Sequence, residues 1–286
     1  MEIKTAFKSQ DGRVKVLKAY DEIIERWPLP NEEIYIDTRY GKTFIIASGR
    51  KEAPPLILLH GSAMNSVMWM GDVPEYAKSY RVYAVDIPGE PGRSEGKQLP
   101  FEGVDFAEWL NDVYIALAID KASLVGISLG AWLAAKFSIY YPDKVEKLVL
   151  LCPAGIGKQR ISFLFKAVFH SALGEKGMDS LIRKVNGSQP IPDEMLEYQK
   201  LIGDNFNYRR EVIPLFSDIE LKRLIMPVIL FVGKKDIMFH SGMTAKRLGS
   251  IVPHANINLL PEAGHVLINL TSEIKEFLAS TNSPEH

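Results

Sequence analysis

The chain has 286 residues, enough for one large domain or for a core domain that carries an insertion. Hydrophobic residues make up 47% of it and charged residues 24%, as in ordinary globular proteins. Its 34 basic and 35 acidic side chains give a formal net charge of -1, which removes any chain-wide electrostatic reason to expect nucleic acid or an anionic membrane as partner.

The N-terminal residues and the cysteine content indicate the compartment. No apolar segment follows the first charges, so a secretory signal peptide is not expected. No run approaches the roughly 18 to 20 apolar residues that span a bilayer. Cys152 is the only cysteine, which rules out an intrachain disulfide, and its apolar surroundings in the sequence suggest a small core residue. We therefore expect a cytoplasmic protein.

A helix and a hairpin are predicted at the start of the chain. Apolar spacing predicts an amphipathic helix over residues 13–26, which Pro28 ends. Alternating apolar residues then predict an antiparallel β-hairpin over residues 32–49, with its turn at residues 39–42.

From residue 55 onward, short runs rich in Val, Ile and Leu alternate with helical stretches. Because the runs are apolar on both faces, they are typical of parallel strands covered on both sides. The runs cover residues 56–61, 81–89, 121–128, 145–153, 226–236 and 255–265. The helical stretches lie around residues 67–78, 104–118, 130–141, 241–250 and 271–279. This alternation predicts an α/β fold with a doubly wound, mostly parallel sheet.

The interval between Pro153 and Met226 breaks the alternation, because it has helical periodicity and no good strand. An insertion there would lie over the C-terminal ends of the strands, where ligands bind in open α/β sheets. We predict a core of residues 1–155 and 217–286 and a helical cap of residues 156–216.

A nucleophile is predicted at Ser128, in the pattern Gly126-Ile127-Ser128-Leu129-Gly130. The pattern alone is weak, but it directly follows a predicted strand and directly precedes a predicted helix, as a nucleophile elbow requires. Glycines suit the crowded backbone around such a turn, and the helix dipole favours negative charge beside the serine.

A serine hydroxyl needs a base, and the base needs a buried carboxylate to orient it. Among six histidines, His265 directly follows the last predicted strand in a loop that can return over the serine. Asp236 closes the preceding predicted strand, whereas Asp204 and Asp218 end no strand-like run. The chain order Ser128, Asp236, His265 is the order expected for a hydrolase sheet of this kind.

The oxyanion of an acyl-transfer reaction needs hydrogen-bond donors. We expect these from the backbone N–H groups of Leu129, which follows the nucleophile, and Ser62, in the loop after the strand at residues 56–61. His60 is interpreted as a structural residue that ties down this loop. No spacing of His, Cys or carboxylates suggests a metal site, and no cofactor is expected.

Several short segments together resemble the α/β-hydrolase superfamily in order and spacing. They are HG at residues 60–61, DIPGEPGRS at 86–94, GISLGA at 126–131, GKKD at 233–236 and GH at 264–265. The helix ending in Trp27, the hairpin, HGSAMNSVMW and DFAEWLNDV more narrowly resemble the small bacterial carboxylesterases that include carboxylesterase NP. The resemblance covers about residues 30–280.

The resemblance implies hydrolysis of esters of bulky apolar acids, with Ser128, Asp236 and His265 as triad and with Ser62 and Leu129 at the oxyanion. The chain departs from many relatives at Ala131, where a second glycine is usual, at Ser62, where a bulky apolar residue is usual, and in the loop containing Glu90 and Pro91.

The predicted function is therefore that of a serine carboxylesterase acting on a small-molecule ester. An apolar substrate pocket is predicted from a set of bulky side chains: Met64, Trp69, Trp132, Phe163 and Phe206. With the same triad, cleavage of a C–C bond, thioester hydrolysis and perhydrolysis stay open, as does a small-molecule sensor that uses the hydrolase pocket. The oligomeric state stays open as well, with a homodimer among the alternatives.

Overall fold

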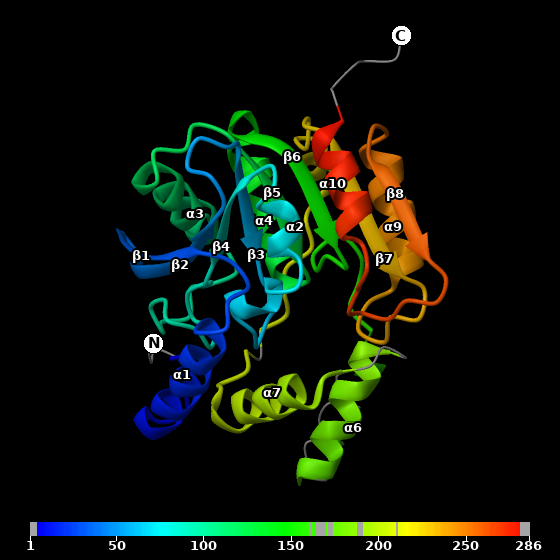
Figure 1. Ribbon diagram of the computed structural model, residues 1–286. Coiled ribbons are helices and arrows are strands. Elements are labelled where there is room, and N and C mark those ends of the chain that lie inside the picture. The colour runs from blue at the N-terminus through cyan, green and yellow to red at the C-terminus, as the bar shows by residue number, and fades with distance from the viewer. Residues whose placement is uncertain are drawn as a thin grey trace.

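An eight-stranded sheet forms the centre of the computed structural model, which describes residues 5–160, 162–163, 170, 174–187, 191–209 and 211–280 (Figure 1). Its strands are β1 (Asn31–Thr38), β2 (Gly41–Ser48), β3 (Pro55–Leu59), β4 (Arg81–Val85), β5 (Ala122–Ile127), β6 (Val145–Leu151), β7 (Val228–Gly233) and β8 (Asn256–Leu260). They lie in the order β1-β2-β4-β3-β5-β6-β7-β8. β1 and β2 are antiparallel to their neighbours and the remaining pairs are parallel, which confirms the predicted doubly wound sheet.

The helices follow the predicted alternation. They are α1 (Gln10–Ile24), α2 (Val73–Tyr76), α3 (Asp105–Ala116), α4 (Leu129–Tyr140), α6 (Gly174–Asn186), α7 (Asp193–Asn205), α8 (Asp218–Leu221), α9 (Ser241–Ile251) and α10 (Thr271–Ala279). The described residues also form the 3-10 turns η1 (Ser66–Trp69) and η2 (Pro142–Lys144). No helix in the described part of the chain is both long enough and apolar enough to cross a membrane.

One helix prediction is wrong in its extent. Residues 67–78 form η1 and the short α2, separated at residues 70–72, rather than one helix. Pro74 explains the break, because its ring would collide with the carbonyl four residues earlier and it has no N–H to donate.

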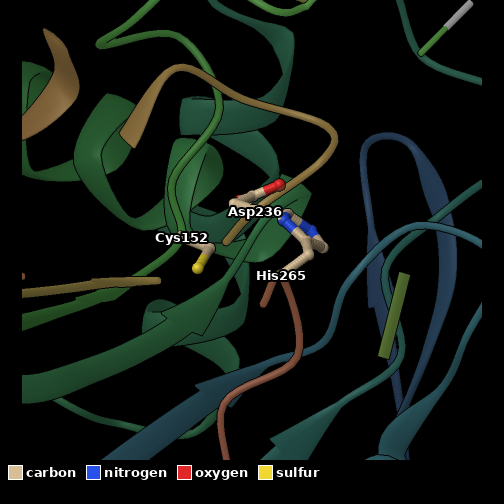
Figure 2. Close-up of side chains that lie close together, drawn as sticks. All are labelled: Cys152, Asp236 and His265. Carbon is tan, nitrogen blue, oxygen red and sulfur yellow. Dashed lines mark hydrogen bonds and ion pairs between the residues drawn. The ribbon is translucent and has the colours of Figure 1, made fainter. Parts of the chain in front are cut away.

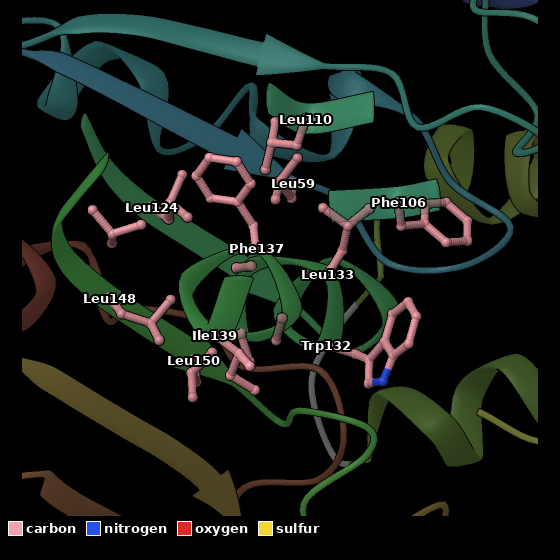
Figure 3. Close-up of a cluster of buried hydrophobic side chains, with 14 of the residues drawn as sticks. Leu59, Phe106, Leu110, Leu124, Trp132, Leu133, Phe137, Ile139, Leu148 and Leu150 are labelled. Carbon is pink, nitrogen blue, oxygen red and sulfur yellow. The ribbon is translucent and has the colours of Figure 1, made fainter. Parts of the chain in front are cut away.

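Successive residues of the central strands pack on opposite faces of the sheet. On β5, Leu124 contacts the cluster formed with α3, α4 and α9, whereas Val125 contacts the cluster formed with α1, α2 and α10. Figure 3 shows the first cluster around α4, where Leu133 and Phe137 lie near residues of β3, β5 and β6. α4 is buried from Leu129 to Ile139 because it is covered on every side.

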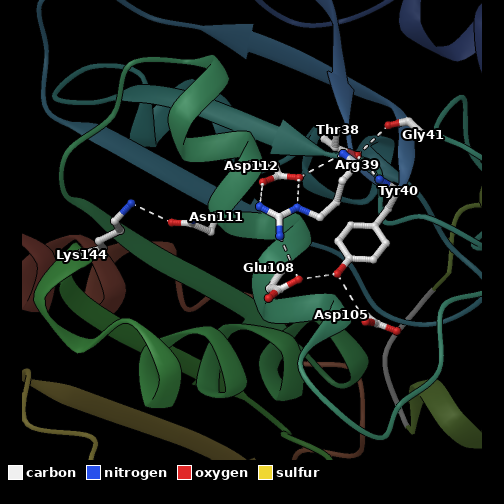
Figure 4. A network of polar contacts seen from close by, with 9 residues as sticks. All are labelled: Thr38, Arg39, Tyr40, Gly41, Asp105, Glu108, Asn111, Asp112 and Lys144. Carbon is white, nitrogen blue, oxygen red and sulfur yellow. Dashed lines mark hydrogen bonds and ion pairs between the residues drawn. The ribbon is translucent and has the colours of Figure 1, made fainter.

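Polar contacts attach the β1–β2 hairpin to α3 (Figure 4). The Arg39 guanidinium binds both carboxylate oxygens of Asp112, at 3.0 and 2.9 Å, and Glu108 at 3.0 Å. The Tyr40 hydroxyl donates to Glu108 at 2.8 Å. The predicted turn therefore anchors the antiparallel edge of the sheet.

Helices α6 and α7 lie between β6 and β7 in the chain, and Figure 1 shows them at one end of the sheet, with α7 next to α1 and α6 on the other side of α7. The described residues of this interval contain no strand, as predicted, although residues 161–173, part of the interval predicted to be helical, lie mostly outside the described residues. The two ends of the interval lie side by side, because Phe216 N–H donates to Gly155 O at 2.8 Å. Arg247 of α9 donates to Ile156 O at 2.7 Å and to Phe216 O at 2.6 Å.

Candidate active site

Ser128 lies in a strained turn between β5 and α4. Its φ of 55° and ψ of -110° are rare for a residue with a side chain. The turn is held because Ser128 N–H donates to Leu151 O of β6 at 2.9 Å, while Ser128 O accepts from Trp132 N–H at 3.0 Å. This strand, turn and helix arrangement is the one expected of a nucleophile elbow.

The two glycines of the motif are required by close backbone contacts. A Cβ on Gly130 would lie 2.1 Å from Leu59 O and 2.5 Å from His60 O. A Cβ on Gly126 would lie 2.4 Å from Gly130 O. Since these contacts are with backbone atoms, no side-chain movement could relieve them, and the turn can pass between β3 and α4 only with glycine.

Asp236 and His265 form a buried pair (Figure 2). His265 Nδ1 lies 2.8 Å from Asp236 Oδ2. The other carboxylate oxygen accepts from the N–H groups of Met238 at 2.6 Å and Phe239 at 3.1 Å, which fixes its orientation. Because Asp236 accepts the Nδ1 proton, the neutral imidazole keeps Nε2 free to accept another proton.

The electrostatics of the pair favour its charged form. Burial alone lowers the pKa of His265, but the hydrogen bond and charge of Asp236, with a contribution from Cys152, outweigh it and raise the pKa above its usual value. For Asp236, burial raises the pKa, but the hydrogen bond and charge of His265 outweigh burial and lower it. Asp236 therefore stabilises a proton on the imidazole.

Cys152 lies beside this pair at the end of β6. Cys152 is buried, as expected. Its Sγ also lies within 4.8 Å of a carboxylate oxygen of Asp236 and of a ring nitrogen of His265, and this proximity was not predicted from the sequence. Like Ser128, it has a left-handed backbone, with φ of 43°. The sequence did contain one signal of this proximity. Cys152 follows a predicted parallel strand, and the carboxyl ends of parallel strands meet at one edge of the sheet.

The structure brings the loop after β3 close to Ser128. A Cβ built on Gly61 would lie 3.8 Å from Ser128 Cβ. The Ser128 hydroxyl makes no hydrogen bond to His265 or to any other described residue. Catalytic hydrogen bonds are often long without substrate, so this geometry leaves the predicted role of Ser128 open.

His60 holds the loop after β3 in place, in agreement with the structural role that the sequence analysis gave it. Its Nδ1 donates to Gly61 O at 2.8 Å and its Nε2 accepts from Ile87 N–H at 2.9 Å. These two bonds require the neutral imidazole, and burial lowers the pKa of His60, which favours that form.

Glu90 is a second residue that was not predicted to belong to the site. It is 1% exposed, and its carboxylate contacts Ser62 and Ala63 in the loop after β3. The sequence marked Glu90 only as a departure from the family pattern. Its burial could not be read from a loop that contains glycine, proline and charged residues.

The residues predicted to line a substrate pocket occupy separate places. Met64, Trp69 and Phe206 are buried in the cluster that includes α1 and α2, whereas Trp132 is buried in the cluster around α4. Phe163 is half-buried. Their contact with substrate stays a prediction. A concavity of about 530 Å³ lies instead at the starts of β3, β5 and β6, away from every predicted site residue.

Comparison with known proteins gives matches over nearly the whole chain. A family model described as alpha/beta hydrolase fold matches residues 54–168. Carboxylesterase YbfK of Bacillus subtilis (strain 168) is 34% identical over 271 residues, covering 91% of this chain and 90% of YbfK. The carboxylesterase nap of the same organism, described as uncharacterized, is 31% identical over 270 residues, covering 90% of this chain and 88% of nap.

Solved structures give the same result. The crystal structure of carboxylesterase CesB (YbfK) from Bacillus subtilis matches with a TM-score of 0.85 and 31% identity, over 94% of this chain and 99% of that one. The crystal structure of naproxen esterase (carboxylesterase NP) from Bacillus subtilis matches with a TM-score of 0.84 and 27% identity, over 95% and 99% of the two chains.

Proposed function

The chain belongs to the α/β-hydrolase family, and we propose that it hydrolyses carboxylic esters through an acyl-enzyme formed on Ser128. Carboxylesterases among its relatives support ester hydrolysis as the reaction. The observation that carries the mechanism is the buried hydrogen bond of 2.8 Å between Asp236 and His265, at the same edge of the sheet as the strained turn at Ser128.

The reaction proceeds in two halves. His265 Nε2 takes the proton of Ser128 Oγ, the oxygen attacks the ester carbonyl, and the carbonyl π electrons move to the oxyanion. The N–H groups of Leu129 and Ser62 hold that oxyanion. His265 then gives its proton to the departing alcohol, and water repeats the sequence on the acyl-enzyme to release the acid. Substrate binding must first bring Ser128 Oγ within hydrogen-bond reach of Nε2.

Asp236 serves this reaction by stabilising its charged intermediate. Each half passes through an imidazolium, whose positive charge faces the buried carboxylate of Asp236. The raised pKa of His265 expresses the same interaction, since it measures how strongly its surroundings favour the protonated ring.

An apolar acid is the proposed substrate class, with residues 156–216 as the cap above it. A buried aromatic cluster lies beside the elbow, and a substrate would reach it only through movement of the cap. Trp132 packs edge-on against Phe101 at 5.4 Å and Phe106 at 5.7 Å, and stacks on Phe216 at 6.0 Å between ring centroids. The relative named as a naproxen esterase is in keeping with this class.

Turnover of p-nitrophenyl esters of increasing acyl length tests the proposal. We expect the parent to hydrolyse them and Ser128→Ala to lose at least about 10⁴-fold in kcat, because no other group replaces the nucleophile. Ser138→Ala is the matched control. Among the described residues, the hydroxyl of this buried serine on α4 donates to Ala134 O alone, so the substitution should leave kcat unchanged.

Full activity in Ser128→Ala would show that the triad is wrongly assigned. A parent inert on every ester would redirect the proposal toward cleavage of a C–C bond or toward a sensor. The profile of kcat/KM against acyl length would give the size of the acyl pocket.

A further inference from the structure

A buried carboxylate, that of Glu90, binds the loop that carries the proposed oxyanion donor Ser62. Glu90 Oε2 accepts a hydrogen bond of 2.7 Å from Ala63 N–H and one of 3.3 Å from Ser62 Oγ. Glu90 lies in the loop after β4, so the contact joins the ends of two neighbouring strands.

The burial of this carboxylate is not explained by packing. Its Oε1 is buried and has no hydrogen-bond partner among the described residues. A buried anion with an unpartnered oxygen costs stability, and an apolar side chain of similar size would fill the same space at lower cost. The position of Glu90 therefore needs an explanation other than packing.

The peptide that Glu90 holds has a constrained backbone. Ala63 is a left-handed residue with φ of 57°, a conformation that costs free energy for alanine and persists only when neighbouring groups impose it. The short bond from Ala63 N–H to Glu90 supplies that constraint. The Ser62–Ala63 peptide is joined at Ser62 Cα to the Gly61–Ser62 peptide, which carries Ser62 N–H. Holding the first peptide and the Ser62 side chain therefore restricts the second, and with it how Ser62 N–H meets an oxyanion.

We propose that Glu90 is a positioning residue of the oxyanion hole, whose ionised carboxylate holds the Ser62–Ala63 peptide in the orientation that the reaction needs. The inference rests on the proposed function, since it assigns Glu90 a part in the same acyl transfer. Glu90 acts through the loop and does not touch the substrate.

The charged and titratable groups that face Glu90 come from the segment after α7. The guanidinium of Arg209 acts on the carboxylate, and Tyr208 has its pKa raised by burial and by the charge of Glu90. No described ion pair joins Arg209 to Glu90, and Arg209 Nε and Nη2 are buried without hydrogen-bond partners. Arg209 is held in place by its bond of 2.6 Å to Leu99 O and by the rings of Phe101 and Phe106.

This environment makes the positioning dependent on pH. Burial raises the pKa of Glu90 to about 7, against the Ala63 hydrogen bond and the charge of Arg209, which lower it. The ionised form accepts stronger hydrogen bonds than the protonated form. Positioning is therefore complete only well above pH 7, is half lost at about pH 7 and weakens further as the pH falls.

The first test is Glu90→Gln, which keeps an acceptor for Ala63 N–H and removes the charge. We expect kcat on p-nitrophenyl esters above pH 8 to fall about three- to tenfold with KM unchanged, because the loop acts on the transition state and not on bound substrate. Glu95→Gln, an exposed glutamate in the same loop, is the matched control and should leave kcat unchanged.

The second test is the pH profile of kcat. Relative to the parent, Glu90→Gln should lose one inflection near pH 7, while the contribution of His265 remains in both proteins. Arg209→Gln should move that inflection to higher pH, since it removes the cation that favours the carboxylate. Carbon-13 NMR of carboxyl-labelled glutamate gives the titration of Glu90 directly, with Glu90→Gln assigning its signal.

Three results would overturn the proposal: an unchanged kcat and pH profile in folded Glu90→Gln, a change in KM alone, or a faster reaction, which would mean that the carboxylate opposes the oxyanion. The proposed function fails differently, by the absence of Ser128-dependent turnover in the parent. An intact Ser128-dependent reaction with an indifferent Glu90→Gln therefore removes this inference alone.

Discussion

Two residues with left-handed backbones, Ser128 and Cys152, end the neighbouring strands β5 and β6. Between them the strands share the bond from Ser128 N–H to Leu151 O. Because β5 and β6 are parallel neighbours, Ser128 and Cys152 lie at the same edge of the sheet, and Cys152 lies beside His265 there. Such a relation depends on strand order, which no local sequence pattern contains.

The role of Asp236 can be tested by one substitution. Asp236→Asn keeps the shape of the side chain but offers an amide N–H to Nδ1, which favours the tautomer that cannot accept a proton from Ser128. We expect kcat on p-nitrophenyl esters to fall about 10⁴-fold with little change in KM. Asp218→Asn is the control, because Asp218 is an exposed partner of Arg247 and should leave kcat unchanged. Equal kcat in parent and Asp236→Asn would contradict the assignment of the acid.

The catalytic candidates were predictable to different degrees. Ser128, Asp236 and His265 each follow or close an apolar run, so strand ends located in the sequence also located them. Glu90 and Cys152 were not found, because their significance lies in contacts with residues of other strands. Local patterns report what a residue's own segment requires, and long-range contacts need the three-dimensional order.

At the scale of single elements, alternation predicted β1 and β2 and apolar runs predicted β3 to β8, but most of the runs extended past the strand ends into loops. The run predicted at 226–236 is observed as β7 over Val228–Gly233, with Asp236 beyond it. α8 was not predicted because only four residues form it, and its capping box between Ser217 and Glu220 was the local signal. Short elements leave too little periodicity to be recognised.

Lys147 on β6 stabilises the end of α10. Its buried Nζ donates to Phe277 O at 2.8 Å, Leu278 O at 2.9 Å and Ser280 O at 2.5 Å, at the end of the helix where carbonyls have no partner in the helix's own backbone ladder. Phe277 O also accepts from Ser280 Oγ. We expect Lys147→Met to lower the free energy of unfolding by about 2 kcal/mol, measured by urea denaturation. Lys121→Met, which removes a half-exposed ion pair with Glu146, should cost less than about 0.5 kcal/mol. Equal losses in the two variants would contradict the capping role.

At the scale of the whole molecule, the first residues that the structure describes contact the interval between β6 and β7. Phe7 pairs with Phe206, and Ala6 O accepts from Asn207 N–H at 2.8 Å. Lys8 Nζ donates to Gly203 O at 3.1 Å and to Asp204 O at 2.9 Å, near the end of α7. Segments about 200 residues apart thus form one contact, and α7 is held from outside its own interval.

Phe7→Ala should loosen α7 selectively. Removing this buried ring costs about 2 to 4 kcal/mol of local packing, so amide hydrogens of α7 should exchange at least tenfold faster. Amides of β5 and β6 should keep their rates, since they lie in the centre of the sheet. Val14→Ala, at an exposed position of α1, is the control. A uniform increase across the sheet would show instead that Phe7 supports the entire fold.

The hydrogen bonds that join the two ends of the interval between β6 and β7 matter for the evolution of the protein and for its engineering. Phe216 N–H is hydrogen-bonded to Gly155 O, and Arg247 donates hydrogen bonds to the carbonyls of Ile156 and Phe216 on the two sides of that contact. The chain therefore leaves the sheet before residue 156 and returns after residue 216 at nearly the same place. A recombination event that cuts at these two points would graft a foreign segment without moving β6 or β7. If this segment contacts the substrate, as proposed, such an exchange would change substrate preference and leave the chemistry unchanged.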